Sequence, residues 1–416
     1  MTLSEELQWR GFVNQTTFSK LSALDSPGIN FYFGVDPSAD SMQIGNLAAA
    51  MMVKTFAKHG HNAFLLVGGA TGLIGDPDGK AQERNLQSKE QIEANKRAIA
   101  EQYKVIFGSL EFTLVDNYDW FEDMHFLDFL RDVGKHVPMR QMLARDFVQT
   151  RLGENGSGIS YAEFSYVLIQ AYDFLHLHIK NNVTLQLCGS DQWGNSIAGV
   201  DLIRRVTSNE AHVYSMPLII NKATGKKFGK TEDGAVWLDR HKTSPTKFYQ
   251  FWVNVDDAGV EDYLKVYTEL EKQEIEEILR KHHEKTSARF GQTCLAEQVT
   301  SLVHGTHEME IAKSITRILV GDTPIGEASD NVIAAMRNEI PYLQTTSNCS
   351  LIDVLTQVGL ATSKSEARRL LDNNAISING SKTSEEKLTL GNFHNNRLLI
   401  RRGKAFKDSA LVELQK

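Results

Sequence analysis

Residues 31–46 read FYFGVDPSADSMQIGN, and this stretch decides the fold. Its first five residues are aromatic, β-branched or glycine, as in a buried strand, and the turn at Asp36 and Pro37 ends that strand. A helix is then expected to begin near Gly45. A helix N-terminus presents unpaired N–H groups and the positive end of a dipole, so this unit has the means to hold a phosphate. Any strand–turn–helix unit shares that property, so the stretch alone predicts an α/β fold and no particular ligand.

Similar runs continue through the first half of the chain and alternate with helical stretches. Besides residues 31–35, strands are expected at residues 63–67, 112–115, 183–187 and 213–220. The turns that follow them include GGATGLIGDPDGK, DNYDW and CGSDQWGN. This alternation predicts a Rossmann-like parallel sheet, in which ligands bind beyond the carboxyl ends of the strands. We therefore expect the polar side chains of these turns to converge on one crevice.

Composition excludes several classes of protein. The 416 residues are 41% hydrophobic and 23% charged, which is ordinary for a globular chain of two or three domains. Three separated cysteines provide neither a disulfide framework nor a CxxC zinc site, and no apolar run is long enough to span a membrane. A cytoplasmic location is the default expectation.

Charge is unevenly distributed along the chain. The net charge is −7, yet residues 350–416 contain 11 Lys and Arg against 7 Asp and Glu. A basic appendage on an acidic body suggests that one end meets a polyanion, and a solvated helix face is the alternative.

The sequence also suggests domain boundaries. We expect a Rossmann-like domain at residues 1–225, with a helical insertion at about 121–160, and a basic loop at 226–240. An α-helical domain is expected at 241–321, where Ser244 and Pro245 are typical of a helix start, and no repeat is evident. A linker at 322–349 and a small α+β domain at 350–416 complete the chain.

The basic loop contains the second informative motif, KKFGKT at residues 226–231. Lys227 and Lys230 bracket a glycine and could stabilise the negative charge that develops on a leaving pyrophosphate. The spacing of the glycines does not match a P-loop. Basic hexamers are also common on solvated surfaces, so this motif too is ambiguous by itself.

Together, the two motifs resemble those of the class I aminoacyl-tRNA synthetases. DPSADSMQIGN corresponds to their HIGH element, and KFGKT corresponds to their KMSKS loop. The intervening segments GGATGLIGDPDGK, YAEFSYVLIQAYDF and CGSDQWGN resemble the bacterial-type tyrosyl-tRNA synthetase family specifically. The resemblance covers essentially the whole chain, and it implies ATP-dependent formation of tyrosyl-adenylate followed by transfer to tRNA(Tyr).

This resemblance assigns two residues to the phenolic hydroxyl of tyrosine and four to its α-ammonium group. The first two are Asp173 and Tyr32, and the others are Tyr166, Gln170, Asp76 and Gln192. In the segment YAEFSYVLIQAYDF, three of these residues are four and three positions apart, so they share one face of a helix. A half-buried structural helix is the alternative, but its Gln and Asp would then need partners.

For ATP, the resemblance implies three groups of residues. Ser38, Gly45 and Asn46 would contact the nucleotide, Gly189 and Asp191 the ribose, and Lys227, Lys230 and Thr231 the phosphates. Lys80 and Arg84, four apart, are further candidates for the pyrophosphate. Mg²⁺ is expected to be carried by the phosphates, with no protein-bound metal.

One position departs from the family pattern. Gln43 stands where the HIGH element commonly begins with histidine. Its amide can donate a hydrogen bond to a phosphate but cannot carry a positive charge, so we expect some lost transition-state stabilisation or compensation by the lysines and Arg84. A second departure, Cys188 in place of a common glycine, is interpreted as structural.

The C-terminal segment resembles an S4-type RNA-binding domain. Two helices and a hairpin turning at Asn379 and Gly380 are expected, with a capping box from Ser363 to Glu366. The basic residues on or beside the second helix are Lys364, Arg368 and Arg369, which we expect to contact RNA.

Further expectations concern partners and competing functions. Residues 131–142 resemble the family's dimer interface, which implies a homodimer. His176, His178, His282 and His283 lack acidic or cysteine partners at ligand spacing, which favours structural roles. The alternatives are a tryptophanyl-tRNA synthetase, a catalytically silent RNA-binding relative, which Gln43 keeps open, and a small-molecule nucleotidyltransferase. The last would not explain the basic tail.

Overall fold

The computed structural model describes residues 1–76, 87–144, 146–153, 156–231, 234–403 and 408–415. The chain divides into two compact units. The first unit contains Met1–Lys242 and Val255–Gly291, and the second contains Thr243–Asn254 and Gln292–Lys416.

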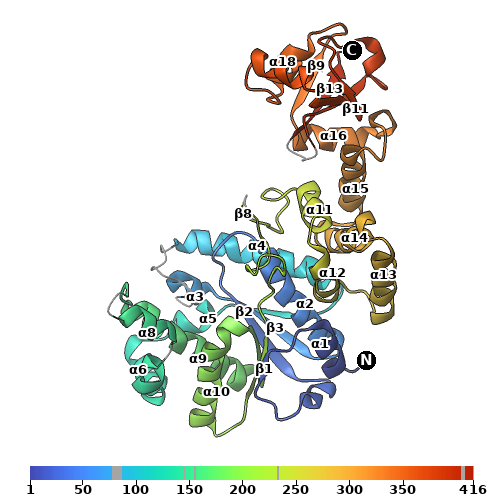
Figure 1. Cartoon of the computed structure of the whole chain (residues 1–416). Helices are drawn as coiled ribbons and strands as arrows, with labels where there is room; N and C mark the ends of the chain where they lie inside the picture. Colours follow the sequence, from blue (N-terminus) through green and yellow to red (C-terminus); the bar gives the residue numbers. More distant parts are fainter. Residues whose placement is uncertain (77–86, 145, 154–155, 232–233, 404–407, 416) are drawn as a thin grey trace. The chain divides into compact units, whose positions relative to one another are not determined.

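A mostly parallel sheet forms the centre of the first unit (Figure 1). Its strand order is β1-β6-β5-β2-β3-β4, in which β1 is antiparallel to β6 and the other neighbours are parallel. The strands are β1 (Gln15–Thr16), β2 (Asn30–Val35), β3 (Asn62–Val67), β4 (Thr113–Val115), β5 (Leu185–Gly189) and β6 (His212–Met216). Buried residues dominate β2, β3 and β5, as expected for strands covered on both faces. The predicted α/β class is confirmed.

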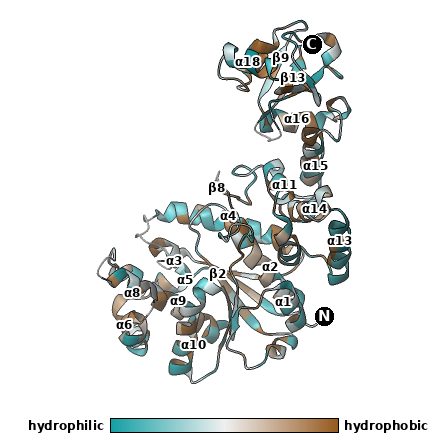
Figure 2. Ribbon diagram, in the orientation of Figure 1, coloured by the Kyte–Doolittle hydropathy of each residue, from teal (hydrophilic) through white to brown (hydrophobic). Residues whose placement is uncertain are grey.

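Helices connect these strands and extend the unit. They are α1 (Leu3–Arg10), α2 (Ile44–Lys58), α3 (Gly69–Ile74), α4 (Lys89–Phe107), α5 (Tyr118–Phe121), α6 (Phe126–Asp132), α7 (Met139–Leu143), α8 (Asp146–Leu152), α9 (Tyr161–Asn181), α10 (Trp193–Thr207), α12 (Val260–Tyr267) and α13 (Lys272–Glu284). A short hairpin of β7 (Lys230–Thr231) and β8 (Gly234–Ala235) lies within the predicted basic loop. α13 is almost entirely hydrophilic (Figure 2).

Two local expectations differ from the structure for identifiable reasons. The strand predicted at residues 213–220 ends as β6 at Met216, because Pro217 has no amide hydrogen with which to continue the ladder. The helical insertion predicted at about 121–160, which the sequence suggests as two helices and a loop, contains several short helices, and Pro138 precedes α7 as its N-cap. Proline fits the start of a helix but cannot continue the one before it.

The second unit contains helices and a small sheet. Its helices are α11 (Pro245–Val253), α14 (Phe290–His304, whose first two residues belong to the first unit), α15 (Thr306–Val320), α16 (Asp330–Glu339), α17 (Leu351–Gln357) and α18 (Lys364–Asp372). The sheet order is β11-β10-β12-β13-β9, from β9 (Tyr342–Thr345), β10 (Ile376–Ile378), β11 (Ser381–Thr383), β12 (Arg397–Arg401) and β13 (Ser409–Leu414).

Several predicted features of the second unit are present. Ser244 caps α11 with Pro245 as its first residue, and Ser363 caps α18 by accepting a hydrogen bond from the Glu366 amide. The predicted capping box is only half formed, because the Glu366 carboxylate accepts its hydrogen bonds from Thr362 and not from the Ser363 amide. The β10–β11 hairpin turns at Asn379 and Gly380, which both have positive φ, as its two-residue turn requires.

The predicted linker at residues 322–349 contains regular structure. It includes α16 and β9, and β9 pairs in parallel with β13. Arg337 on α16 donates hydrogen bonds to Glu413 on β13, which ties the segment to the small sheet. Sequence reasoning missed β9 because its pairing partner lies about seventy residues later in the chain.

Candidate active site

A cavity of about 520 Å³ lies at the carboxyl ends of β2 and β5 in the first unit. It is bounded by the start of α2, one face of α9, the turn after β5 and the loop before β7. The predicted site residues that line it are Tyr32, Ser38, Gln43, Gly45, Asn46, Asp76, Tyr166, Gln170, Asp173, Gly189, Asp191, Gln192 and Lys227. The carboxyl edge of the sheet therefore brings together turns that lie up to about 190 residues apart in sequence.

One face of α9 forms a wall of the cavity. Tyr166, Gln170 and Asp173 all face it, as their spacing predicts. Ser160 caps the helix by accepting a hydrogen bond from the Glu163 amide. The Tyr166 hydroxyl donates to Asp36 Oδ2 at 2.7 Å, so Asp36, which sequence reasoning did not assign, fixes the orientation of this phenol.

Asp173 is almost completely buried and is held by two donors. Asn117 Nδ2 donates to one carboxyl oxygen at 3.1 Å, and Trp120 Nε1 donates to the other at 3.0 Å. Burial raises the pKa of the Asp173 carboxyl well above its usual value, while these two hydrogen bonds lower it. The donors favour the ionised form and fix the direction of its free lone pairs.

Asn117 and Trp120 belong to the segment DNYDW, whose polar turn the sequence indicated without a role. Asn117 is itself fixed, because its side chain also bonds to Thr71 Oγ1 and accepts from the Ala70 amide. Their position directly after β4 could have indicated a role in the site, because the carboxyl ends of the strands form the edge at which the cavity lies.

Buried polar atoms without protein partners lie on this side of the cavity. Among the described residues, the hydroxyl of Tyr32 and the side-chain oxygens of Gln170 and Gln186 are buried and have no hydrogen-bond partner. Burying such atoms unpaired costs about 1–3 kcal/mol each. Gln186 stands beside Tyr32 in register across β2 and β5, and sequence reasoning did not assign it. These atoms fit a ligand that carries both donors and acceptors.

A further acidic group lies beside the α9 face. Asp76 accepts a hydrogen bond from the Gln192 side chain, and both residues line the cavity. Burial raises the pKa of the Tyr166 phenol well above its usual value, and the nearby Asp36 and Asp76 raise it further. The phenol therefore stays neutral, and the carboxylates give this end of the cavity a negative potential suited to a cation.

The N-terminus of α2 forms the opposite side of the cavity. Gln43 is the N-cap, and Asn46 Oδ1 accepts a hydrogen bond from the Gln43 amide at 3.0 Å. A Cβ added to Gly45 would meet nothing within 4 Å, so the backbone here faces open space. That space, beside the first turn of α2 and the positive end of its dipole, can accommodate a nucleotide.

The basic loop is joined to the start of α2 by backbone hydrogen bonds. The Val236 amide donates to the Gly229 carbonyl, and the Ile44 amide donates to the Val236 carbonyl, at 3.1 and 3.2 Å. Lys227 Nζ lies 3.5 Å from Asp191 Oδ2. The start of α2 and the KFGKT loop thus face the same part of the cavity.

Some predicted residues cannot be placed in full. Lys80 and Arg84 lie outside the described residues. Lys230 and Thr231 form β7, and only their backbone is described. In the second unit, Lys364, Arg368 and Arg369 are exposed on α18, where Lys364 forms an ion pair with Asp353 at 2.7 Å.

The histidines considered as metal ligands make other contacts. His176 stacks on Trp120, and His178 Nδ1 contacts the Val183 carbonyl oxygen at 2.9 Å. Across the part of the chain that the structure describes, no group of three or more His, Cys, Asp or Glu side chains is arranged to hold a metal ion. Within the same residues, no helix is both long and apolar enough to cross a membrane.

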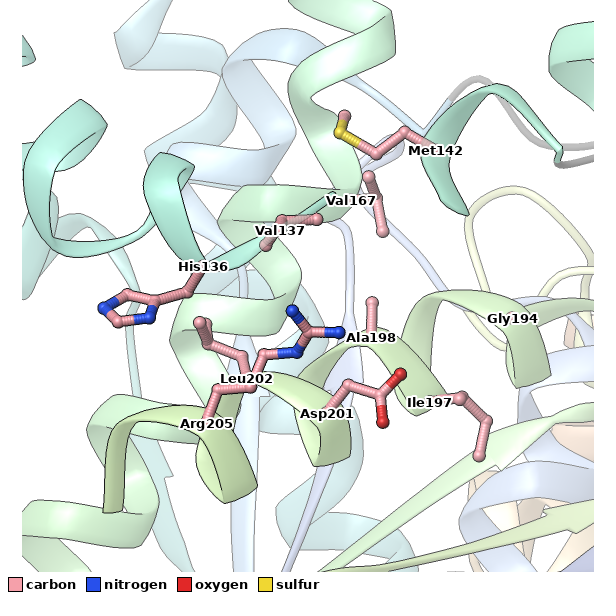
Figure 3. Close-up of a pocket in the computed structure, with 10 residues that line it drawn as sticks. All are labelled: His136, Val137, Met142, Val167, Gly194, Ile197, Ala198, Asp201, Leu202 and Arg205. Carbon is pink, nitrogen blue, oxygen red and sulfur yellow. The ribbon is translucent and has the colours of Figure 1, made fainter. Parts of the chain in front are cut away.

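A second, smaller cavity of about 220 Å³ lies between the turn η2 (Gly134–His136), α7, α9 and α10 (Figure 3). Val137 and Met142 line it together with Val167, while His136, Asp201 and Arg205 supply its polar groups. None of the predicted site residues lines it, but part of the segment predicted as a dimer interface does.

The fold and site match a known class of enzyme. A parallel sheet whose carboxyl edge holds a polar cavity, with a helix N-terminus joined to a basic loop on one side of it, is the arrangement expected of class I tRNA synthetases. The family model for class I tRNA synthetases (W and Y) matches residues 26–320.

The particular family follows from the remaining comparisons. The model for the tyrosine-tRNA ligase SYY-like C-terminal domain matches residues 332–407. The chain is 41% identical over 425 residues to tyrosine-tRNA ligase 2 of Bacillus cereus, covering 100% of both chains. It is 43% identical to the tyrosine-tRNA ligase of Staphylococcus haemolyticus, covering 97% of both. The chain belongs to the tyrosine-tRNA ligase family.

Solved structures agree with this assignment. A C-terminally truncated mitochondrial tyrosyl-tRNA synthetase of Aspergillus nidulans is 30% identical, with a TM-score of 0.69, covering 76% of this chain and 93% of that one. The tryptophanyl-tRNA synthetase of Plasmodium falciparum is 15% identical with a TM-score of 0.54, covering 80% of this chain and 88% of that one. At that identity the likeness shows the shared fold alone.

Proposed function

We propose that this chain joins L-tyrosine to tRNA(Tyr) in two steps, with Asp173 and Tyr32 recognising the phenolic hydroxyl. The first step forms tyrosyl-adenylate and pyrophosphate from tyrosine and ATP, and the second transfers the tyrosyl group to the 3′-terminal ribose and releases AMP. The observation that carries the proposal is the buried, doubly hydrogen-bonded Asp173 opposite the unpartnered Tyr32 hydroxyl.

Recognition of the amino acid uses both ends of the α9 face. The substrate hydroxyl would donate to Asp173 and accept from Tyr32, which supplies a partner for a buried hydroxyl. The α-ammonium group would lie among Asp76, Tyr166 and Gln170, where it would donate hydrogen bonds to carboxylate oxygens and to the Gln170 amide oxygen. Gln192 donates a hydrogen bond to Asp76 and so orients its carboxylate.

Discrimination against phenylalanine follows from the same geometry. A ligand without the hydroxyl leaves the buried Tyr32 hydroxyl without a partner and deprives the buried Asp173 carboxylate of a third donor, and that penalty falls only on the wrong substrate. Tyrosyl-tRNA synthetases are the standard example of this effect, at about 10⁵-fold, a value borrowed from the family.

Activation requires positioning and charge stabilisation. A tyrosine carboxylate oxygen bonds to the α-phosphorus while the bond from that phosphorus to the pyrophosphate oxygen breaks. No general base is needed, because the carboxylate is already an anion. Gln43, Ser38 and Asn46 at the start of α2, with Lys227 and Lys230 of the loop, would hold the phosphates, and Lys80, Arg84 and Thr231 remain candidates for the same role.

The ribose and metal have separate proposed partners. Gly189 and Asp191 would bind the ribose, since a Cβ on Gly189 would lie 2.6 Å from Asp191 Oδ1 and displace that carboxylate. Mg²⁺ on the phosphate oxygens would neutralise part of the triphosphate charge. The described residues at the phosphate side, Ser38, Gln43 and Lys227, are mostly donors, which suits phosphates that carry their own metal.

Transfer to tRNA completes the reaction. A hydroxyl of the terminal ribose attacks the carbonyl carbon, loses its proton to solvent, and displaces AMP. Lys364, Arg368 and Arg369, exposed on α18, would contact the RNA backbone.

We propose a homodimer formed through the helical insertion. Large hydrophobic side chains are exposed there, including Phe126 at 62% and Leu127 at 75% on α6, which shows both hydrophobic and hydrophilic segments in Figure 2. Others are Met139, Leu143, Leu152 and Tyr161. A patch of this kind on a folded unit is typical of a subunit interface. Sedimentation equilibrium measures the oligomeric state.

The cytoplasm is the proposed location. The cysteines Cys188, Cys294 and Cys349 are free thiols, as expected in a reducing compartment that also supplies ATP and tRNA.

Charging of tRNA(Tyr) with labelled tyrosine tests the proposed function. We expect ATP-dependent incorporation that Asp173→Ala abolishes while the protein stays folded. Undiminished incorporation by folded Asp173→Ala would contradict the role given to this carboxylate.

A further inference from the structure

A single buried aromatic residue interrupts the basic loop. Lys226 and Lys227 are exposed, whereas Phe228 between Lys227 and Gly229 is only 5% exposed. Its ring stacks on that of Tyr263 in α12, with centroids 4.2 Å apart and an interplanar angle of 24°, and its centroid lies 5.8 Å from that of Tyr267. Phe228 therefore packs the KFGKT segment against α12, in addition to the backbone hydrogen bonds that join the loop to α2.

The place of Tyr263 depends on a glycine. A Cβ on Gly259 would lie 2.3 Å from Cε2 of Tyr263 and within 2.6 Å of its Cζ and Oη. The φ of Gly259 is −94°, which any residue adopts, so glycine is needed here for space and not for conformation. Any side chain at this position would push the Tyr263 ring away from its present position.

The loop is held on its other side by the start of α2. Gly229 has a φ of +90°, and a Cβ there would lie 3.2 Å from Ile44 Cβ. The Phe228 amide donates to the Ile219 carbonyl at 2.9 Å. Phe228 thus fixes a short loop between two supports, and the adjacent Lys227 points to Asp191 at the cavity.

α12 is a firm support for this contact. Arg10 of α1 donates hydrogen bonds to the carbonyls of Lys265, Thr268 and Leu270 at the end of α12. Lys54 of α2 also forms an ion pair with Glu269 at 2.8 Å. The rings of Tyr263 and Tyr267 are therefore carried by an element that is tied to both α1 and α2.

We propose that Phe228 is a positioning residue for tyrosine activation, which acts by stacking on Tyr263, in space left by Gly259, to hold Lys227 at the phosphate side of the cavity. This inference rests on the proposed function and adds α12 to the apparatus that supports it. The side chains proposed to bind tyrosine lie on α9 and β2 and at Asp76 and Gln192, and the stacked residues are not among them. The stack should therefore affect the reaction rate and leave tyrosine binding intact.

The expected size of the effect follows from the chemistry. Lys227 stabilises charge that develops on pyrophosphate only when its ammonium group is correctly placed, and a displacement of about 1 Å can cost about 100-fold in rate. We expect Phe228→Leu and Gly259→Ala each to lower kcat for activation by about 10- to 100-fold.

The experiment measures tyrosine-dependent pyrophosphate exchange in the full-length chain. The kcat, the KM for ATP and the KM for tyrosine are determined for Phe228→Leu, Gly259→Ala, Tyr263→Leu and Tyr263→Phe. Tyr263→Phe keeps the ring and should retain wild-type kcat, whereas Tyr263→Leu should not. Phe107→Leu is the matched control, because Phe107 is equally buried in an aromatic cluster on α4 and does not line the cavity.

The result expected is a fall in kcat for the first three variants with a KM for tyrosine within about twofold of wild type. Thermal melting confirms that each variant is folded, and if Phe228→Leu does not fold, Gly259→Ala and the Tyr263 pair decide the matter. Unchanged kcat in the folded variants, or an equal loss in Phe107→Leu or Tyr263→Phe, overturns the proposal. Absence of exchange by the wild-type protein would instead contradict the proposed function.

Discussion

Asp173 shows how one residue depends on neighbours that are distant in sequence. The presence of Tyr32 and Asp173 in one cavity could be expected from the family pattern, because both residues occur in recognisable segments. Asn117 and Trp120 could not be assigned as its donors, since they lie 56 and 53 residues before it and only the parallel sheet brings them together.

Replacing Trp120 tests this arrangement through its pH dependence. Burial raises the pKa of Asp173 and the Trp120 hydrogen bond lowers it, so Trp120→Phe raises the pKa further. As pH falls, the carboxyl becomes neutral and accepts the substrate hydroxyl less strongly. The KM for tyrosine should therefore rise about 5- to 10-fold at neutral pH, and its increase on acidification should begin at a higher pH than in wild type.

The measurement is the KM for tyrosine in the exchange assay, determined over the whole pH range in which the wild-type protein stays folded. His176→Gln serves as a control, because His176 stacks on the other side of Trp120 without bonding to Asp173. Identical pH profiles for Trp120→Phe and wild type would show that the Trp120 hydrogen bond does not lower the pKa of the Asp173 carboxyl.

Among the helices and strands, the positions of the strands and the polar face of α9 could be predicted from the sequence. The exact ends of the elements, and the helices against which loops pack, could not. The hydrophobic pattern reveals β2 and β3 because both are buried on two faces. It does not reveal β9, an edge strand of half-buried residues, nor that α12 supports the KFGKT loop. Such contacts depend on tertiary packing that local patterns do not contain.

Arg10 offers a stability test of the α1–α12 connection. Its guanidinium satisfies three carbonyls at the end of α12, and Arg10 is only 5% exposed. Arg10→Met leaves those carbonyls without their donor, at an expected cost of about 2–4 kcal/mol. The melting transition of the first unit should fall by roughly 5–10 °C.

Scanning calorimetry with and without tyrosine identifies that transition, because a ligand raises the Tm of the unit that binds it. Arg280→Met is the control, since Arg280 is an exposed residue of the first unit whose ion pair with Glu284 contributes little. An unchanged transition in Arg10→Met would mean that water replaces the lost donor without penalty.

At the scale of the whole molecule, charge distinguishes the acidic body from the basic C-terminal segment. Deleting residues 350–416 is a poor test of that segment, because Leu399 and Leu411 pack with Ile315 and Met336 in one hydrophobic cluster of the second unit. The deletion would expose this cluster, so a loss of RNA binding could not be distinguished from a loss of folding.

Charge removal on α18 avoids this difficulty. The triple variant Lys364→Gln, Arg368→Gln, Arg369→Gln should lower kcat/KM for tRNA by about 10- to 100-fold and flatten its dependence on salt, because fewer counterions are released. The exchange reaction without tRNA should be unchanged. The control variant replaces Lys272, Arg280 and Lys281 of the hydrophilic α13 by Gln. An equal loss of kcat/KM for tRNA in the two triple variants would refute a specific role for α18.

The central claim is that the cavity at the carboxyl edge of the sheet activates tyrosine and selects it by its hydroxyl. Its most direct test is amino-acid-dependent exchange of labelled pyrophosphate into ATP, without tRNA, with tyrosine, tryptophan and phenylalanine in parallel. We expect rapid exchange with tyrosine and, by family precedent, exchange with phenylalanine lower by about 10⁵-fold in kcat/KM. Folded protein that binds tyrosine but supports no exchange, or that prefers tryptophan, would contradict it.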